Sequence, residues 1–109
     1  MDVREPKYSA GQLWRYSTPK GLEDTRLLVL KVEALDNEEV VHVTVVGGGD
    51  GMAEHMPFST DAIDRSVVDL VDDTYPPRNF EEGYLIWRKL FESGKAGIYR
   101  VTLGEALEL

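Results

Sequence analysis

The stretch Arg26–Val46, which reads RLLVLKVEALDNEEVVHVTVV, decides the fold. Apolar residues dominate residues 26–35 and 40–46, and valine is the commonest residue of the second run, which is typical of strands. Two faces are expected on the first run: Leu28, Leu30, Val32 and Ala34 on one, and Leu27, Val29, Lys31 and Glu33 on the other. The polar residues 36–39 form a short connection, so the sequence predicts an antiparallel hairpin.

Shorter strands are predicted around this hairpin. Residues 12–17 carry alternating aromatic side chains and end at Pro19 and Gly21, which favour a turn. Residues 54–58 are expected to form a brief strand that Pro57 limits, and residues 98–103 a last strand that returns to the sheet. Residues 47–51 contain four glycines and are interpreted as a mobile loop, because they lack the lysine and the spacing of phosphate-binding loops.

A first helix is predicted to begin at Ser59 or Thr60, either of which suits an N-cap. Its apolar stripe follows helical spacing through Ile63, Val67, Leu70 and Val71. The Tyr75–Pro77 segment is expected to end this region, since proline cannot continue a helix.

A second helix carries the clearest signals in the chain. Asn79 and Glu82 have the spacing of a capping box, and Gly94 suits a left-handed C′ position. Its apolar stripe consists of Phe80, Tyr84, Trp87 and Phe91. Thr102 and Glu105 are expected to cap a final helical turn.

Together these elements predict an α+β fold in a single domain over residues 1–109, with residues 1–10 as a loosely ordered lead-in. The expected architecture is a small twisted antiparallel sheet or partly open barrel of about four to five strands. Two amphipathic helices are expected to pack against one side of it.

The composition excludes several classes of protein. There is no cysteine, so no disulfide and no thiolate metal site can form. Residues 1–7 are of mixed charge, and no run approaches the ~20 apolar residues of a membrane helix. The sequence therefore predicts a soluble cytoplasmic protein that does not engage a membrane.

Charge is concentrated in one segment. The net charge is −8, and residues 54–82 hold eight carboxylates against two arginines. A field of this sign repels nucleic acids and favours a basic protein partner. The candidate partner-binding residues are Asp69, Asp72, Asp73, Glu81 and Glu82, with Trp14 and Tyr16 as an aromatic patch if their strand face is exposed.

No catalytic constellation is recognised, so the chain is predicted not to be an enzyme. It has no cysteine nucleophile and no Gly-x-Ser-x-Gly elbow, and its carboxylates are too numerous for any pair to stand out. Asp50, Glu54, His55 and His42 offer metal donors, but their spacing matches no ligand pattern. Neither a metal nor another cofactor is expected.

Four segments carry a resemblance to a known group. They are GQLWRY at 11–16, HMPFS at 55–59, FEEGY at 80–84 with Trp87-Arg88, and GKAG at 94–97. Together they resemble a group of small uncharacterised bacterial proteins of about this length, from Gly11 onward. The resemblance implies a bacterial cytosolic origin and carries no activity.

Three functional hypotheses follow. The leading one is a non-enzymatic protein-binding module, in its sharper form an immunity or antitoxin-like inhibitor of a basic toxin such as a nuclease. The alternative is a small-molecule-binding domain or minor enzyme, with a pocket that holds His42 or His55 near Trp14. The third is an accessory subunit that assembles with copies of itself.

Overall fold

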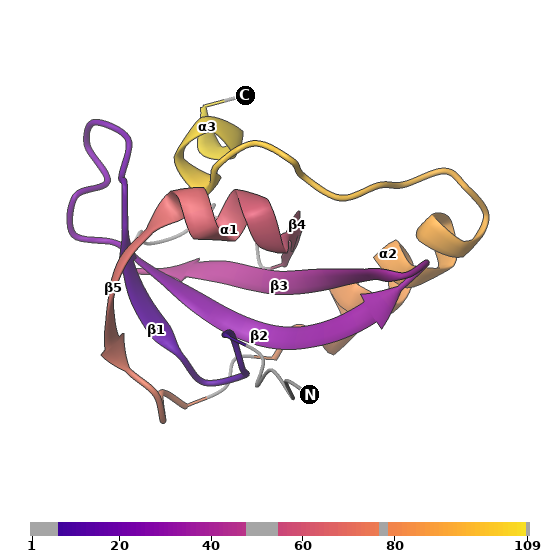
Figure 1. The fold of residues 1–109 in the computed structure, drawn as a ribbon, viewed down its shortest axis with the longest axis horizontal. Coiled ribbons are helices and arrows are strands. Elements are labelled where there is room, and N and C mark those ends of the chain that lie inside the picture. Colours follow the sequence, from indigo (N-terminus) through magenta and orange to yellow (C-terminus); the bar gives the residue numbers. More distant parts are fainter. Residues whose placement is uncertain (1–6, 48–54, 77–78, 109) are drawn as a thin grey trace, which may run out of the picture.

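The computed structural model describes residues 7–47, 55–76 and 79–108. Five strands form one antiparallel sheet in the order β4-β3-β2-β1-β5 (Figure 1), which confirms the predicted α+β class. The strands are β1 (Leu13–Tyr16), β2 (Arg26–Leu35), β3 (Glu38–Val46), β4 (Met56–Ser59) and β5 (Val67–Asp72). The helices are α1 (Thr60–Ser66), α2 (Glu81–Glu92) and α3 (Leu103–Leu107). No described helix has both the length and the apolar character needed to cross a membrane.

The β2–β3 hairpin forms as predicted. Leu35 pairs with Glu38, and the turn consists of Asp36 and Asn37 alone. Both turn residues have positive φ values, 51° and 64°, the geometry of a type I′ turn, whose twist matches that of antiparallel strands. Aspartate and asparagine adopt this conformation more readily than other residues with a side chain.

A bulge in β2 changes which side chains share a face. Val29 pairs with Val43 and Lys31 with His42, so Leu30 has no opposite residue in β3. Beyond the bulge the alternation is reversed: Val32 joins the core face of Val29, and Glu33 lies on the face of Leu28. The predicted face assignment is therefore wrong from Lys31 onward, because strict alternation takes no account of the extra residue.

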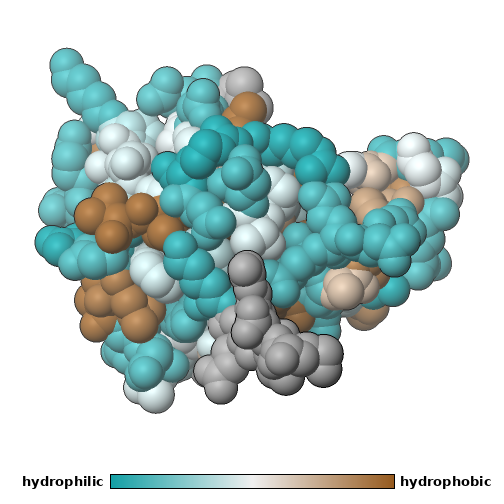
Figure 2. All heavy atoms as spheres, viewed as in Figure 1, coloured by the Kyte–Doolittle hydropathy of each residue, from teal (hydrophilic) through white to brown (hydrophobic). Residues whose placement is uncertain are grey.

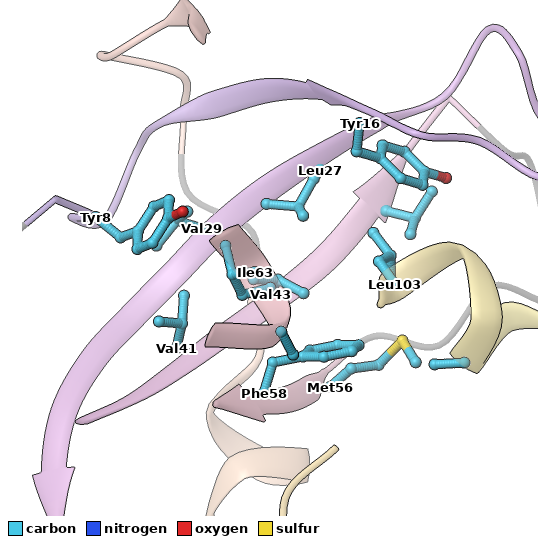
Figure 3. Packing of buried hydrophobic residues seen from close by; sticks show 13 residues of the cluster. Tyr8, Tyr16, Leu27, Val29, Val41, Val43, Met56, Phe58, Ile63 and Leu103 are labelled. Atoms are coloured by element: carbon cyan, nitrogen blue, oxygen red, sulfur yellow. The ribbon is translucent and has the colours of Figure 1, made fainter. Parts of the chain in front are cut away.

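The main core lies between one face of the sheet and helices α1 and α3. Figure 3 shows Leu27, Val29, Val41 and Val43 of the sheet converging on Ile63 and Leu103 of these helices. Tyr8 belongs to the same cluster and is fully buried, with its hydroxyl donating to Asp64 Oδ1 at 2.5 Å. The expectation of a loose lead-in is thus wrong for residues 7–10, while residues 1–6 lie outside the described part.

The second face of the sheet is covered by α2 and the segment before it. Leu13, Leu28, Leu30 and Val46 form a smaller apolar cluster there, against Tyr75 and Phe80. Helices therefore cover both faces, whereas the sequence analysis placed them on one side. The physical reason is that residues 27–30 are apolar on both faces of β2 and each face must be buried.

The start of α2 differs from the predicted capping box. Phe80 is the N-cap residue, and no side chain caps the helix. The Phe80 ring packs against the second-face cluster and lies 6.5 Å from the His55 ring, so packing fixes where the helix begins. The C-terminal end is as predicted, since Gly94 follows the helix with a φ of 76°.

Residues 67–72 form a strand, and the prediction that they continue the first helix is wrong. Helix α1 begins after the N-cap Ser59, as expected, but ends at Ser66. Strand β5 then pairs with β1. The segment contains three β-branched residues, Val67, Val68 and Val71, which favour a strand. The spacing of its apolar residues also fits the stripe of a helix. The pairing with β1 therefore determines that the segment is a strand.

Residues 98–103 do not form the predicted last strand. Tyr99 makes a single parallel bridge to Phe58, in which Tyr99 N donates to Pro57 O and Ser59 N donates to Tyr99 O. Leu103 already belongs to α3, which Thr102 and Glu105 cap reciprocally as predicted.

Candidate functional site

A histidine pair on the second face of the sheet is the centre of the candidate site. His42 lies between Val41 and Val43 on β3, and since these valines point into the main core, His42 points to the opposite side. It is completely buried there. Its Nδ1 lies 2.7 Å from Nε2 of His55, which precedes β4, and the two ring planes differ by 20°. The two rings thus share one hydrogen bond in nearly the same plane.

The bulge in β2 adds a carboxylate to this pair. Glu33 Oε2 lies 3.7 Å from His42 Nε2, which is longer than a hydrogen bond. Tyr84 donates its hydroxyl to Glu33 at 2.6 Å, and Arg88 Nη1 donates to Glu33 Oε1 at 3.0 Å. Tyr84 and Arg88 are one helical turn apart on α2, so both can bind the same carboxylate. Glu33 therefore holds this helix against the sheet.

The position of His42 Nε2 near Glu33 favours one arrangement of the protons. Within the described chain, His42 Nε2 is the one buried side-chain polar atom without a hydrogen-bond partner. A proton on Nε2 points toward the negative Glu33, whereas a lone pair there would face it unfavourably. His42 Nδ1 is then the acceptor and His55 Nε2–H the donor. This leaves His55 Nδ1 unprotonated, as a hydrogen-bond acceptor.

Burial keeps both imidazoles neutral. It lowers the pKa of His42 from 6.5 to about 3, with smaller contributions from His55, Lys31 and Arg88. Burial also lowers the pKa of His55, although the charge of Glu33 opposes this shift. The pKa of Tyr84 is raised by burial and by its bond to Glu33. At neutral pH the site therefore consists of two neutral rings and a neutral phenol beside one carboxylate.

An apolar groove of about 690 Å³ opens beside His55. It lies between α2 and the segment of residues 97–99, and its lining residues are His55, Pro57, Gly83, Ile86, Trp87, Leu90, Gly97, Ile98 and Tyr99. Trp87 connects its two sides, because its Nε1–H donates to Gly97 O at 2.9 Å. Ile86 and Leu90 are 58% and 41% exposed, so the groove leaves large apolar side chains open to solvent.

The facing nitrogens of His42 and His55 are at hydrogen-bond distance in this structure. The described residues contain no group of three donors placed to hold an ion. His42 Nδ1 and His55 Nε2 face each other at hydrogen-bond distance, closer than two nitrogens bound to one tetrahedral zinc ion. Asp50 and Glu54, which the sequence analysis considered as further donors, lie outside the described residues.

The predicted pocket differs from the observed groove in one respect. The groove contains His55, as the small-molecule hypothesis requires, but Trp14 is not beside it. Trp14 packs against the main core, on the other face of the sheet, with its ring 5.6 Å from that of Tyr8. Tyr16 is buried in the same core, and its hydroxyl lies 2.7 Å from Thr25 Oγ1. The strand face of Trp14 and Tyr16 is therefore an inner face.

The five acidic candidates lie in two places. Asp69, Asp72 and Asp73 belong to β5 or follow it, and Glu81 and Glu82 form the first turn of α2. All five are exposed. In Figure 1, β5 lies at the left and α2 towards the right, so the two acidic groups belong to separate elements. Arg15 neutralises Asp69 through two hydrogen bonds of 2.6 and 2.5 Å.

Glu33, Tyr84 and Arg88 were missed by sequence reasoning. Glu33 was assigned only to a face of its strand, and Tyr84 only to the apolar stripe of the second helix. The one available signal was the i, i+4 spacing of Tyr84 and Arg88, which places two donors on one helix face. No family model, curated protein or solved structure matches this chain.

Proposed function

We propose that this chain binds a small, mainly apolar compound that donates a hydrogen bond to His55. The observation that carries the proposal is the groove beside the histidine pair. Its volume is typical of small-molecule sites, which combine apolar walls with few polar groups. His55 is a titratable residue in the lining of the groove. Its hydrogen bond to the buried His42 holds its ring in one orientation.

The chemistry of the ligand follows from the lining. His55 Nδ1 accepts a hydrogen bond, so the ligand carries an N–H or O–H group. Trp87 and Tyr99 offer aromatic surfaces, which favour a planar ring system. The net charge of −8 disfavours an anion. A neutral phenol-like or indole-like compound meets all three conditions.

A matched pair of probes tests the proposal. 4-Ethylphenol donates a hydrogen bond, and 1-ethyl-4-fluorobenzene has nearly the same shape without the donor. We expect the fluorobenzene to bind at least about tenfold more weakly, because it leaves the acceptor of His55 unsatisfied. Two-dimensional NMR provides the readout: the indole N–H of Trp87 shifts on titration, while that of Trp14, on the other face of the sheet, is an internal control.

A substitution at the acceptor completes the test. His55→Phe retains an aromatic ring and removes the acceptor, so the variant is expected to bind the two probes equally. Equal affinities in the unaltered protein would refute the proposal, as would shifts that leave Trp87 unaffected.

Inhibition of a basic toxin is the second proposal. It rests on the exposed carboxylates of Asp72, Asp73, Glu81 and Glu82, for which the described chain offers no ion pair. Titration of the chain against a panel of basic nucleases tests it, and inhibition of none of them counts against it. It is the weaker proposal because the carboxylates belong to two separate elements, the end of β5 and the first turn of α2.

A further inference from the structure

Glu33 is a carboxylate that the fold withdraws from water. Most of the molecular face shown in Figure 2 is hydrophilic, and a carboxylate on such a surface is solvated. The Glu33 side chain is only 12% exposed, because the bulge in β2 turns it toward the second face of the sheet. There it accepts hydrogen bonds from Tyr84 and Arg88 and faces His42 Nε2 at 3.7 Å. Two donors on α2 thus fix its position.

His42 connects Glu33 with the groove. Glu33 is not among the residues that line the groove, whereas His55 is. His42 lies near Glu33 with its Nε2 and binds His55 Nε2 with its Nδ1. A neutral imidazole donates through one nitrogen and accepts through the other, so the state of one end of this chain of three side chains determines the state of the other end. His55 Nδ1 makes no hydrogen bond to the described residues, so it is the end that a ligand meets.

We infer that Glu33 is a specificity-determining residue of the groove, which acts through His42 without touching the ligand. The inference rests on the proposed binding of ligands at His55. An ionised carboxylate only accepts, so the proton of His42 lies on Nε2 and the groove presents an acceptor. A donor in the place of this carboxylate would put the proton of both rings on Nδ1, and the groove would present a donor. The ligand class would then change from hydrogen-bond donors to acceptors such as aryl ketones, with neither ring charged.

The substitution Glu33→Gln supplies such a donor in a side chain of the same size. Glu33 Oε1 lies 3.0 Å from Arg88 Nη1 and 2.9 Å from the Tyr84 hydroxyl. Arginine has no acceptor, so the amide oxygen of the variant takes the place of Oε1 and the NH₂ group takes that of Oε2. The NH₂ group then faces His42 Nε2, and a shift of about 0.7 Å reduces the present 3.7 Å to a hydrogen bond. The reversed arrangement therefore gives a partner to the unpaired nitrogen of His42.

Nitrogen-15 NMR of the histidine rings tests the inference without a ligand. Two-bond proton–nitrogen correlations distinguish a ring protonated on Nε2 from one protonated on Nδ1. At neutral pH we expect His42 and His55 to carry the proton on Nε2 in the unaltered protein and on Nδ1 in Glu33→Gln. The control Glu108→Gln removes the same charge from an exposed residue at the end of α3 and should change neither ring. A merely structural role of Glu33 would not exchange the tautomers of both rings.

Acetophenone and α-methylstyrene test the effect on ligand binding. The two probes have nearly the same shape, and acetophenone alone carries a carbonyl oxygen that accepts a hydrogen bond. The ratio of their affinities, measured from the shift of the Trp87 indole N–H, should rise at least about tenfold in favour of acetophenone in Glu33→Gln. In the His42→Leu background the connection between Glu33 and His55 is interrupted, so Glu33→Gln should leave this ratio unchanged.

Three results would overturn the inference. They are a proton on Nδ1 of His55 in the unaltered protein, an unchanged tautomer in Glu33→Gln, and a ratio that changes as much in the His42→Leu background as outside it. Circular dichroism shows whether each variant folds, and the tautomers of the unaltered protein test the inference even where Glu33→Gln does not fold. If neither probe shifts the Trp87 signal in any of these proteins, the proposed function fails, whereas the tautomers report on Glu33 independently.

Discussion

Replacement of His42 by leucine should make the protein more resistant to acid. The His42 side chain is fully buried and lacks a partner for Nε2, so its protonated form is strongly disfavoured in the folded chain. Leucine has a similar volume and no proton to gain. At pH 7 the substitution has two opposing effects on the free energy of unfolding. Loss of the hydrogen bond to His55 lowers it, and removal of the buried unpaired nitrogen raises it. We expect the free energy of unfolding there to change by less than about 1.5 kcal/mol.

The size of the effect follows from the pKa. The folded value is about 3, and the ordinary value, taken for the unfolded chain, is 6.5. Between these pH values the unfolded state binds more protons, so His42 lowers stability as pH falls. Each pKa unit corresponds to about 1.4 kcal/mol, and pH 4 lies about 2.5 units below the unfolded pKa. The unaltered protein should therefore lose about 3 kcal/mol through His42 between pH 7 and pH 4.

Urea unfolding of both proteins between pH 7 and pH 4 measures this loss. Carboxylates such as those of Glu38 and Asp69, whose pKa values are lowered by arginine partners, destabilise both proteins on acidification. Their contribution cancels in the difference between the two curves. That difference should grow by about 3 kcal/mol in favour of His42→Leu. Two curves that stay parallel down to pH 4 would refute the reasoning.

Four further predictions concern single positions. Gly104→Ala should destabilise the protein by about 1–3 kcal/mol, because a Cβ there would lie 2.7 Å from a backbone oxygen. Gly83→Ala, whose Cβ would meet its nearest atom at 3.8 Å, should leave stability unchanged or raise it by up to about 1 kcal/mol, and thermal melts compare the two. Thr102→Ala removes the capping box of α3 and should cost about 1 kcal/mol in urea unfolding. Glu33→Gln removes a cause of the raised pKa of Tyr84, so that pKa should fall in an ultraviolet titration; an unchanged value would contradict the described contact.

Elements with two agreeing local signals were predicted to exist, although the predicted ends were wrong for some of them. The β2–β3 hairpin combines alternating apolar residues with a polar connection, which is the two-residue turn of Asp36 and Asn37 rather than the expected residues 36–39. Helix α3 combines a capping box with an apolar face. Where the apolar spacing was the single signal, as in residues 67–72, it fitted both a helix and a strand. Pairing with β1, a contact distant in sequence, made the choice.

The candidate site was only partly predictable. His42 lies on the face opposite Val41 and Val43, and this placement follows from the regular alternation of side chains along β3. Its contact with His55 depends on the pairing of β3 with β4, and the approach of Glu33 depends on the bulge at Leu30. Neither the strand pairing nor the bulge can be recognised from neighbouring residues in the sequence, since the bulge is a single unpaired residue within a run of apolar residues. Composition and spacing therefore singled out the two histidines but did not identify Glu33, Tyr84 or Arg88 as members of the site.

The bulge at Leu30 has an evolutionary consequence. Because side chains alternate along a strand, one residue more or less moves every later side chain to the other face. A single codon inserted or deleted at this point would therefore transfer Glu33 between the main core and the histidine pair, and Val32 in the opposite sense. The carboxylate of the site could thus be acquired or lost in one mutational step, without any substitution at the residues that form it. Among relatives of this chain, the length of β2 would then be a better marker of the site than the identity of its residues.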